Sequence, residues 1–272
     1  MITIKIGGSV VDNLHPTTIS DIKKVVEQEG VILVHGGGKE VTKVTEQLGK
    51  EPKFVVSPSG IKSRYTDKET SEIFTMVMSG RINKNIVQML QKNGINAVGL
   101  SGMDGKVIQA NRKKKLIIMN EKGRKQVIDG GYTGKISNVN ADLISTILEK
   151  GYTPVISPIA ISEEFDFLNV DGDRAAANVA GHVKTDKVLF ITNVDGLLMD
   201  DKLVESLTLT EAKEILPKVG FGMEKKILAA TEALEMGVTE ALIANGQKEN
   251  PISSAIAHDN CTVITKWVKI SI

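Results

Sequence analysis

Three glycine clusters in the 272-residue chain have the composition and placement of an anion-binding site. Each follows a run of β-branched residues, and the clusters are Gly7-Gly8-Ser9, Gly36-Gly37-Gly38 and the stretch from Gly99 to Gly105. Glycine lets backbone N–H groups approach phosphate or carboxylate oxygens, and a helix that follows adds the positive end of its dipole. Ligands of α/β sheets bind at the carboxyl ends of the strands, so three such loops predict one anion site. Each cluster alone is equally compatible with an ordinary strand–helix turn.

The common nucleotide-binding motifs are absent from the sequence. Gly36 and Gly38 match the start of the dinucleotide motif G-x-G-x-x-G, but the next required glycine is replaced by Val41. Gly134-Lys135 lacks the upstream glycine of a P-loop. Neither His-Arg-Asp nor Asp-Phe-Gly of the protein kinases occurs. If the chain uses ATP, it therefore binds the nucleotide by another arrangement.

The residues around the glycine clusters predict the elements that position them. Short β-branched runs alternate with amphipathic stretches, which is typical of a mainly parallel sheet covered on both faces. Pro16 with Thr17 opens one predicted helix, and Asp67 caps another. The sequence thus predicts an α/β fold, a three-layer α/β/α sandwich. The predicted strands are 2–6, 31–34, 95–99, 154–157, 188–192, 241–244 and 262–265.

Two segments depart from this alternation. Residues 106–139 alternate like hairpins with glycines at the turns. Residues 157–169 are acidic and are expected to form a loop. We expect a single domain over 1–272 with two lobes, 1–168 and 169–272.

Charge and cysteine content exclude several classes of protein. The chain has 34 Lys and Arg against 33 Asp and Glu, a net charge of +1, which argues against general nucleic-acid or membrane-surface binding. Cys261 stands alone, so we expect no disulfide framework and a reducing, cytoplasmic location. No signal peptide or membrane-spanning run is recognised, and no metal-binding motif predicts protein metal ligands.

Five motifs, in order and over nearly the whole chain, resemble the amino acid kinase family. They are Lys5-Ile6-Gly7-Gly8-Ser9, His35-Gly36-Gly37-Gly38, Asn169-Val170-Asp171-Gly172-Asp173, Ile191-Thr192-Asn193-Val194-Asp195-Gly196-Leu197 and Gly222-Met223-Glu224-Lys225-Lys226. The resemblance implies the carbamate kinase-like fold. Within the family, the sequence is most similar to N-acetylglutamate kinases and to kinases of aminoadipate or glutamate attached to the acidic amino-group carrier protein LysW, which serve lysine and arginine biosynthesis.

The resemblance implies transfer of the γ-phosphoryl group of ATP to a side-chain carboxylate, giving an acyl phosphate. A carboxylate is already ionised at pH 7, so this reaction needs no general base. Its barrier lies in bringing two anions together and in the charge on the transferred group, which lysines and backbone N–H groups can stabilise. We expect Mg²⁺ to accompany ATP and to be held mainly by the nucleotide phosphates.

The resemblance also implies roles for individual residues. Lys5 and Lys226 would stabilise the transition state, and Asp173 would hold both ammonium groups. Without the resemblance, Lys5 could end a strand in solvent, Lys226 could lie on a helix face and Asp173 could cap a helix. The implied substrate-binding residues are Gly37, Gly38, Arg64 and Asn169. The implied nucleotide-binding residues are Gly8, Thr192, Asn193, Asp195, Gly196, Gly222 and Met223.

A basic segment bears on the identity of the acceptor. Seven cationic residues and one acid, Glu121, lie between Arg112 and Gln126. An acidic protein that carries the acceptor on its C-terminal residue would be attracted and oriented by this predicted hairpin. The alternative is a solvated hairpin whose lysines protect its edge strands. The candidate carrier-binding residues are Lys113, Lys114, Lys115 and Arg124.

Other readings stay open on the sequence alone. The acceptor could be free N-acetylglutamate. The same fold could also serve a non-catalytic amino-acid sensor or a uridylate kinase. The apolar residues of 73–90 could form a homodimer or higher-oligomer interface, as in relatives, or a core-facing stripe.

Overall fold

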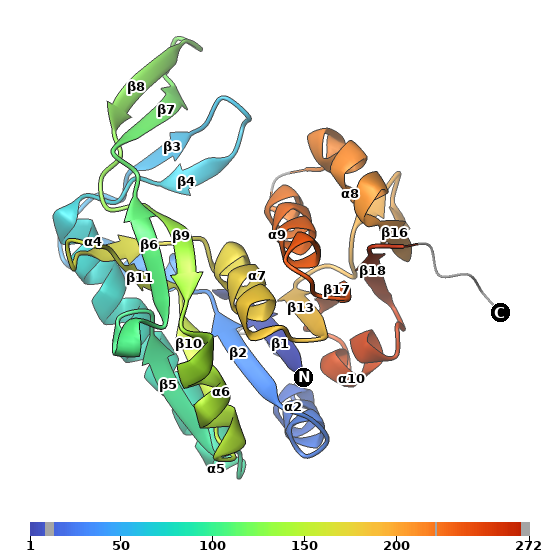
Figure 1. Cartoon of the computed structure of the whole chain (residues 1–272). Helices are drawn as coiled ribbons and strands as arrows, with labels where there is room; N and C mark the ends of the chain where they lie inside the picture. Colours follow the sequence, from blue (N-terminus) through green and yellow to red (C-terminus); the bar gives the residue numbers. More distant parts are fainter. Residues whose placement is uncertain (9–13, 221, 268–272) are drawn as a thin grey trace.

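A mostly parallel eight-stranded sheet forms the centre of the computed structural model, which describes residues 1–8, 14–220 and 222–267 (Figure 1). All neighbouring strands are parallel except β17 and β18, which pair antiparallel. The order across the sheet is β16 (Ser206–Thr208), β18 (Cys261–Thr265), β17 (Glu240–Asn245), β13 (Lys187–Thr192), β1 (Ile2–Ile6), β2 (Val31–His35), β10 (Thr153–Ser157) and β5 (Ala97–Ser101).

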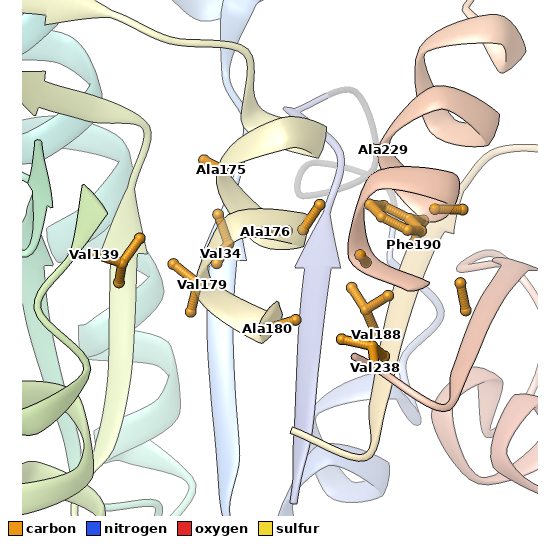
Figure 2. Packing of buried hydrophobic residues seen from close by; sticks show 14 of the residues in the cluster. Val34, Val139, Ala175, Ala176, Val179, Ala180, Val188, Phe190, Ala229 and Val238 are labelled. Atoms are coloured by element: carbon orange, nitrogen blue, oxygen red, sulfur yellow. The ribbon is translucent and has the colours of Figure 1, made fainter. Parts of the chain in front are cut away.

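Helices cover both faces of this sheet because each buried strand is apolar on both sides. On β2, Val34 belongs to one core and Leu33 to the other. The first core packs small side chains such as Ala176 and Ala229 close to Phe190 (Figure 2). Its helices are α6 (Ala141–Glu149), α7 (Gly172–Val183), α8 (Leu209–Ile215) and α9 (Met223–Glu235). The second core lies under α2 (Thr18–Val26), α3 (Gly38–Gln47), α4 (Lys68–Thr75), α5 (Asn83–Lys92) and α10 (Pro251–Ile256). The predicted three-layer α/β/α sandwich is confirmed.

Smaller sheets surround the central one. A four-stranded sheet has the order β12 (Phe167–Asn169), β11 (Ile159–Ile161), β6 (Ile108–Arg112) and β9 (Gly134–Val139). The hairpins are β3 (Phe54–Val56) with β4 (Lys62–Arg64), β7 (Lys115–Met119) with β8 (Lys125–Asp129), and β14 (Leu198–Met199) with β15 (Lys202–Leu203). The first two hairpins project from the same end of the molecule, opposite α9 (Figure 1). Short 3₁₀ helices occur at η2 (Asp104–Lys106) and η3 (Leu216–Lys218).

The structure corrects two expectations about secondary structure. Residues 157–169 are not a loop, because β11 and β12 form an antiparallel pair in which Ala160 faces Leu168 and both are fully buried. The acids that suggested a loop occupy the turn between these strands. The strand expected over 95–99 begins at Ala97, since the N–H of Ile95 still bonds to Leu90 O at the end of α5.

The long apolar helical stretch is interrupted by a π-helix, η1 (Met76–Ile82), between α4 and α5. Asp67 caps this stretch as predicted, accepting a hydrogen bond from Thr70 N at 2.8 Å. Most of its apolar side chains lie in the second core, as a core-facing stripe would, whereas Met76 is 58% exposed. In the described part of the chain, no helix has the length and apolar character needed to cross a membrane.

Candidate active site

Two lysines from distant elements meet at one buried carboxylate. Lys5 Nζ lies 2.6 Å from Asp173 Oδ1, and Lys226 Nζ lies 3.4 Å from Asp173 Oδ2. Lys5 is only 7% exposed and Asp173 only 5%. These three side chains form what we call the lysine–aspartate centre.

The positions of these side chains follow from local structure. β1 is a central strand whose Lys5 lies between Phe190 of β13 and Val34 of β2. Asp171 is the N-cap of α7, accepting from Asp173 N at 3.0 Å, so Asp173 lies in the first turn of that helix. On the sequence alone, Asp173 could cap a helix. In the structure Asp171 is the cap and Asp173 lies in the first turn. Lys226 lies in the first turn of α9.

The lysine–aspartate centre has an excess of positive charge. Although burial disfavours its charged form, Lys5 and Lys226 hold the pKa of the Asp173 carboxyl below its usual range. Burial also lowers the pKa of Lys226, and the nearby Lys5 lowers it further, while Asp173 opposes both effects. Two ammonium groups around one carboxylate leave one positive charge uncompensated, which favours binding of an anion.

Two of the glycine clusters meet beside this centre. A Cβ atom at Gly8 would overlap the backbone of Gly37, so the two loops lie in direct contact. A Cβ atom at Gly37 would overlap Ile82 and Met78, which belong to the π-helix. Gly38 begins α3 and directs that helix N-terminus toward the same region. These loops, Lys5 and Asp173 line a cavity of about 530 Å³, which we call the glycine-loop cavity, whereas Lys226 is not part of its described lining.

A buried histidine fixes the second glycine loop. His35 Nδ1 contacts Gly36 O at 3.0 Å, and Asn83 Nδ2 lies 3.2 Å from His35 Nε2. Asn83 is fully buried and also donates to Val155 O at 2.9 Å, which ties the loop to β10. Burial lowers the pKa of His35 to about 4, and the nearby Lys5 contributes in the same direction. A neutral ring with its proton on Nδ1 satisfies both contacts.

The implied acceptor-binding residues lie at the edge of the glycine-loop cavity. Arg64 Nη2 donates to Gly38 O at 2.9 Å and to Thr42 Oγ1 at 2.6 Å. Its Nη1 is buried and has no hydrogen-bond partner among the described residues. Asn169 Nδ2 donates to Thr66 Oγ1 at 3.0 Å. An unpartnered guanidinium nitrogen at this place suits a carboxylate ligand.

The third glycine cluster does not join this site. Gly99 lies within β5, and a Cβ there would overlap Asn83 Oδ1. Gly102 packs closely against Ile159 O, and the cluster is not part of the described lining of the glycine-loop cavity. The expectation of three converging loops was therefore wrong. β10 separates β5 from β2, which places this loop farther along the sheet edge.

The four candidates from Thr192 to Gly196 lie at the carboxyl end of β13, with Thr192 as the last residue of the strand. Thr192 Oγ1 donates to Asn193 Oδ1 at 3.4 Å. Asp195 accepts from Asn245 Nδ2 at 2.8 Å and pairs with Lys248 at 2.8 Å. At Gly196, a Cβ would overlap the hydroxyl group of Thr262. These contacts define the shape of a turn on the β17 and β18 side of the sheet.

Gly222 and Met223 lie at the start of α9. Gly222 has a φ of 89°, which favours glycine, and Met223 begins the helix. Among the nucleotide candidates, the described lining of the glycine-loop cavity includes Gly8. It includes neither Gly222 and Met223 nor the four candidates from Thr192 to Gly196. Of the candidate nucleotide-binding residues, Gly8 therefore lines the cavity and the others lie outside its described lining.

The carrier-binding candidates lie on or beside the β7–β8 hairpin. Lys114, Lys115 and Arg124 are exposed, whereas Lys113 is half-buried at the base of the hairpin. On the same hairpin Ile117 faces Val127 across the two strands, and they are 54% and 59% exposed. The segment expected to form basic hairpins does so.

The sequence interpretation gave no role to Lys225. Its Nζ donates to Lys62 O at 3.1 Å and lies 3.7 Å from Asp171 Oδ2. Lys225 therefore joins α9 to the β3–β4 hairpin and to the cap of α7. The adjacent pair Lys225-Lys226 was the available signal, but the sequence alone does not say which partner each lysine meets.

Metal-binding side chains do not gather at this site. In the described ranges, no group of three or more His, Cys, Asp or Glu residues is arranged to hold a metal ion. The residues present therefore do not fit a metal centre built wholly from protein ligands.

The chain is similar to a known protein family and to named proteins of that family. A family model described as the amino acid kinase family matches residues 1–245. A protein of Metallosphaera sedula named LysW-aminoadipate/LysW-glutamate kinase is 46% identical over 258 residues, covering 94% of this chain and 97% of the relative. A protein of Nitrosopumilus maritimus, which has the same name with a provisional qualifier, is 83% identical over 264 residues, covering 97% and 99%.

Solved structures share the fold at low sequence identity. The protein smu.665 from Streptococcus mutans has a TM-score of 0.79 at 24% identity, covering 98% of each chain. N-acetylglutamate synthase from Neisseria gonorrhoeae has a TM-score of 0.78 at 21% identity, covering 99% of this chain and 60% of the other. Carbamate kinase from Giardia lamblia has a TM-score of 0.64 at 15% identity, covering 97% of each chain.

Proposed function

Because the chain belongs to the amino acid kinase family, we propose that it transfers the γ-phosphoryl group of ATP to the side-chain carboxylate of aminoadipate or glutamate carried on LysW. The product is an acyl phosphate, formed in lysine or arginine biosynthesis. The family and the full-length relatives support the reaction and its acceptor. The lysine–aspartate centre is the single structural observation on which the proposed mechanism rests.

In this mechanism, Lys5 and Lys226 stabilise the charge that develops during transfer. Asp173 holds both ammonium groups, at 2.6 and 3.4 Å, and the remaining positive charge attracts the transferring phosphoryl group. The backbone N–H groups of Gly8, Gly37 and Gly38 bind phosphoryl and acceptor oxygens beside it. The acceptor carboxylate is already ionised, so no side chain has to remove a proton.

Arg64 and Asn169 bind the amino-acid end of the acceptor. The buried, unpartnered Nη1 of Arg64 supplies a donor for a carboxylate, and Asn169 adds an amide at the same edge. The nucleotide extends from the glycine loops toward the turn Thr192–Gly196 and toward Gly222-Met223 at the start of α9. Mg²⁺ that accompanies ATP is held mainly by the phosphates, and we assign no residue of this chain to it.

The exposed cations of the β7–β8 hairpin attract the carrier. Lys114, Lys115 and Arg124 form a basic surface, and Ile117 with Val127 adds an apolar contact between the strands. A small free amino acid has no use for such a surface, whereas an acidic protein would be guided by it. Lys113 at the base of the hairpin belongs to the same set. We place the enzyme in the cytoplasm because Cys261 is its only cysteine, and we propose a homodimer or higher oligomer through the stretch 73–90, where Met76 is exposed.

The test compares acceptors under the same conditions. The purified chain is incubated with ATP and Mg²⁺ and with LysW loaded with aminoadipate, LysW loaded with glutamate, or free N-acetylglutamate. Hydroxylamine traps the acyl phosphate as a hydroxamate, and ADP release gives the rate. We expect kcat/KM to be higher for a loaded carrier than for N-acetylglutamate. Faster turnover of the free acetylated amino acid would contradict the carrier assignment, and the Lys226→Ala variant controls for contaminating kinases.

A further inference from the structure

Arg112, the last residue of β6, belongs to the basic segment but makes its contacts within the protein. Its Nε donates to Gly131 O at 2.7 Å, and its guanidinium carbon lies 4.2 Å from the centroid of the Tyr132 ring. Asp166 Oδ2 lies 3.8 Å from Arg112 Nη1 and balances part of the charge. These contacts fix the guanidinium group against the chain between β8 and β9.

The peptide unit between Gly131 and Tyr132 is held from both sides. Its carbonyl oxygen, Gly131 O, accepts from Arg112, and its N–H, that of Tyr132, donates to Thr66 O at 2.6 Å. A charged donor at the carbonyl group polarises the peptide and strengthens its N–H as a donor, because successive hydrogen bonds reinforce one another. Arg112 therefore strengthens the bond that ties Tyr132 to Thr66.

The close approach of these two chains requires glycine. Gly131 has a φ of 58°, and a Cβ atom at this position would overlap Thr66 O. The two chains thus meet through backbone atoms, and no side chain lies between them to absorb a displacement. A shift of the chain at Tyr132 is therefore passed on to Thr66.

The same contacts reach Asn169, one of the two residues proposed to bind the amino-acid end of the acceptor. Tyr132 O accepts from Asn169 N at 2.9 Å, and Asn169 Nδ2 donates to Thr66 Oγ1 at 3.0 Å. With the bond between Tyr132 and Thr66, they close a triangle of three hydrogen bonds. Thr66 is fully buried and lies two residues after Arg64, the other acceptor-binding residue. The position of Asn169 relative to Arg64 thus depends on Tyr132.

We propose that Arg112 is a positioning residue for the acceptor. By fixing Tyr132, it sets the relative placement of Arg64 and Asn169, between which the amino-acid end of the acceptor is bound. The inference rests on the proposed function, which assigns these two residues to the acceptor. It separates Arg112 from the exposed cations of the hairpin, which attract the carrier by their charge. A lysine would keep the charge but lacks the planar group that donates to a carbonyl while it stacks on a ring.

Substitutions that keep either the charge or the ring test this role. Arg112→Lys keeps the charge and loses the planar group, and Tyr132→Leu loses the ring. Each should raise KM for the acceptor by roughly tenfold, the effect of losing one charge-assisted hydrogen bond, with little change in kcat or in KM for ATP. Tyr132→Phe keeps the ring and should restore the KM. Arg81→Lys, at an exposed ion pair with Glu40 on η1, controls for the exchange of arginine for lysine.

Hydrogen exchange gives a second readout that does not depend on turnover. The backbone amides of Tyr132 and Asn169 should exchange faster in Arg112→Lys than in the wild type, because the triangle opens more easily. Thermal unfolding shows whether each variant is folded. If Arg112→Lys does not fold, the comparison of Tyr132→Leu with Tyr132→Phe carries the test.

The acceptor in these assays is the one that the wild type turns over, either the loaded carrier or free N-acetylglutamate. If the acceptor KM is unchanged in folded Arg112→Lys, the positioning role is wrong and the proposed function stands. An equal rise in KM for ATP would indicate general distortion of the site and would also overturn the role. Turnover of N-acetylglutamate alone by the wild type would refute the carrier assignment, and the role is then decided on that acceptor. A wild type that phosphorylates neither acceptor refutes the proposed function and this inference with it.

Discussion

Lys225 on α9 donates a hydrogen bond to the backbone carbonyl of Lys62 on the β3–β4 hairpin, at 3.1 Å. The next residue, Lys226, turns to Asp173 in the lysine–aspartate centre instead. One helical turn therefore reaches both the proposed reacting centre and the hairpin beside the acceptor. Adjacent residues of the same type are expected to make different contributions to the reaction, which mutation can separate.

Removing either central lysine should impair chemistry more than folding. Lys5→Ala and Lys226→Ala each leave Asp173 with one cationic partner, so no unpaired buried carboxylate results. We expect kcat to fall by roughly 10²–10³-fold, as for loss of one preorganised electrostatic group. Steady-state kinetics and thermal unfolding measure the two effects. Near-normal kcat in both well-folded variants would refute the proposed mechanism.

Lys225→Met should give a different kinetic result from Lys226→Ala. The variant loses the contact to the Lys62 carbonyl and the pairing with Asp171, so the β3–β4 hairpin, which carries Arg64, is held less firmly against α9. We expect KM for the acceptor to rise by about tenfold, the effect of one lost hydrogen bond to a charged group, with a smaller change in kcat. A loss confined to kcat would mean that Lys225 acts in the chemical step.

The exposed hairpin cations should control the salt dependence of carrier use. In Lys114→Ala/Lys115→Ala/Arg124→Ala, KM for the carrier should rise at low salt and depend less on ionic strength, because exposed charges are screened over about 10 Å at 0.1 M salt. The control variant Lys24→Ala/Lys92→Ala/Lys150→Ala also removes three charges from exposed positions. If the KM for the carrier depends on ionic strength equally in the two triple variants, the hairpin cations do not guide the carrier and the hairpin is simply solvated.

His35 should make the folded state sensitive to acid. Its pKa is about 4 in the folded chain, because of burial, against about 6.5 for an unperturbed histidine. As pH falls from about 6.5 to about 4, the unfolded chain binds a proton that the folded chain does not, so this residue costs up to roughly 3 kcal/mol of stability. His35→Gln keeps an acceptor for Asn83 and removes the titration.

Urea unfolding of both proteins at several pH values measures this effect. The stability of His35→Gln relative to wild type should improve as pH falls through that window and should level off below about 4. Carboxylates that titrate in both proteins cancel in the difference. A difference in unfolding free energy that stays constant between pH 7 and pH 4 would contradict the assignment.

Much of the fold could be predicted because local and global preferences agree. Apolar β-branched runs gave the central strands, and the ordered motifs placed Lys5, Asp173 and Lys226 on the elements that bring them together. The acidic residues within 157–169 led to a wrong prediction of a loop. Their charge indicates an exposed turn but says nothing about the pairing of the two strands that the turn joins. Buried Ala160 and Leu168 were the better signal.

The strand order and the space between elements could not be predicted from local sequence. The loop after β5 also contains glycines, but β10 separates β5 from β2, and that order arises only in the assembled sheet. The cavity of about 660 Å³ between the projecting hairpins and α7 and α9 depends in the same way on how these helices lie against residues near Lys113 and Thr133. The spacing of residues along the chain does not indicate which elements become neighbours in the folded protein.

The contact between Gly8 and Gly37 limits how this enzyme can diversify. A side chain at Gly8 would overlap the backbone of Gly37 and push the two loops apart. A side chain at Gly37 would instead overlap Ile82 and Met78 of the π-helix, so neither position accepts a larger residue without rearrangement. Inherited change is thereby directed away from the proposed phosphoryl-transfer loops and toward the two hairpins, where most side chains are exposed or half-buried. Descendants of one ancestral kinase could thus acquire new acceptors by altering the hairpins while retaining the same apparatus for using ATP.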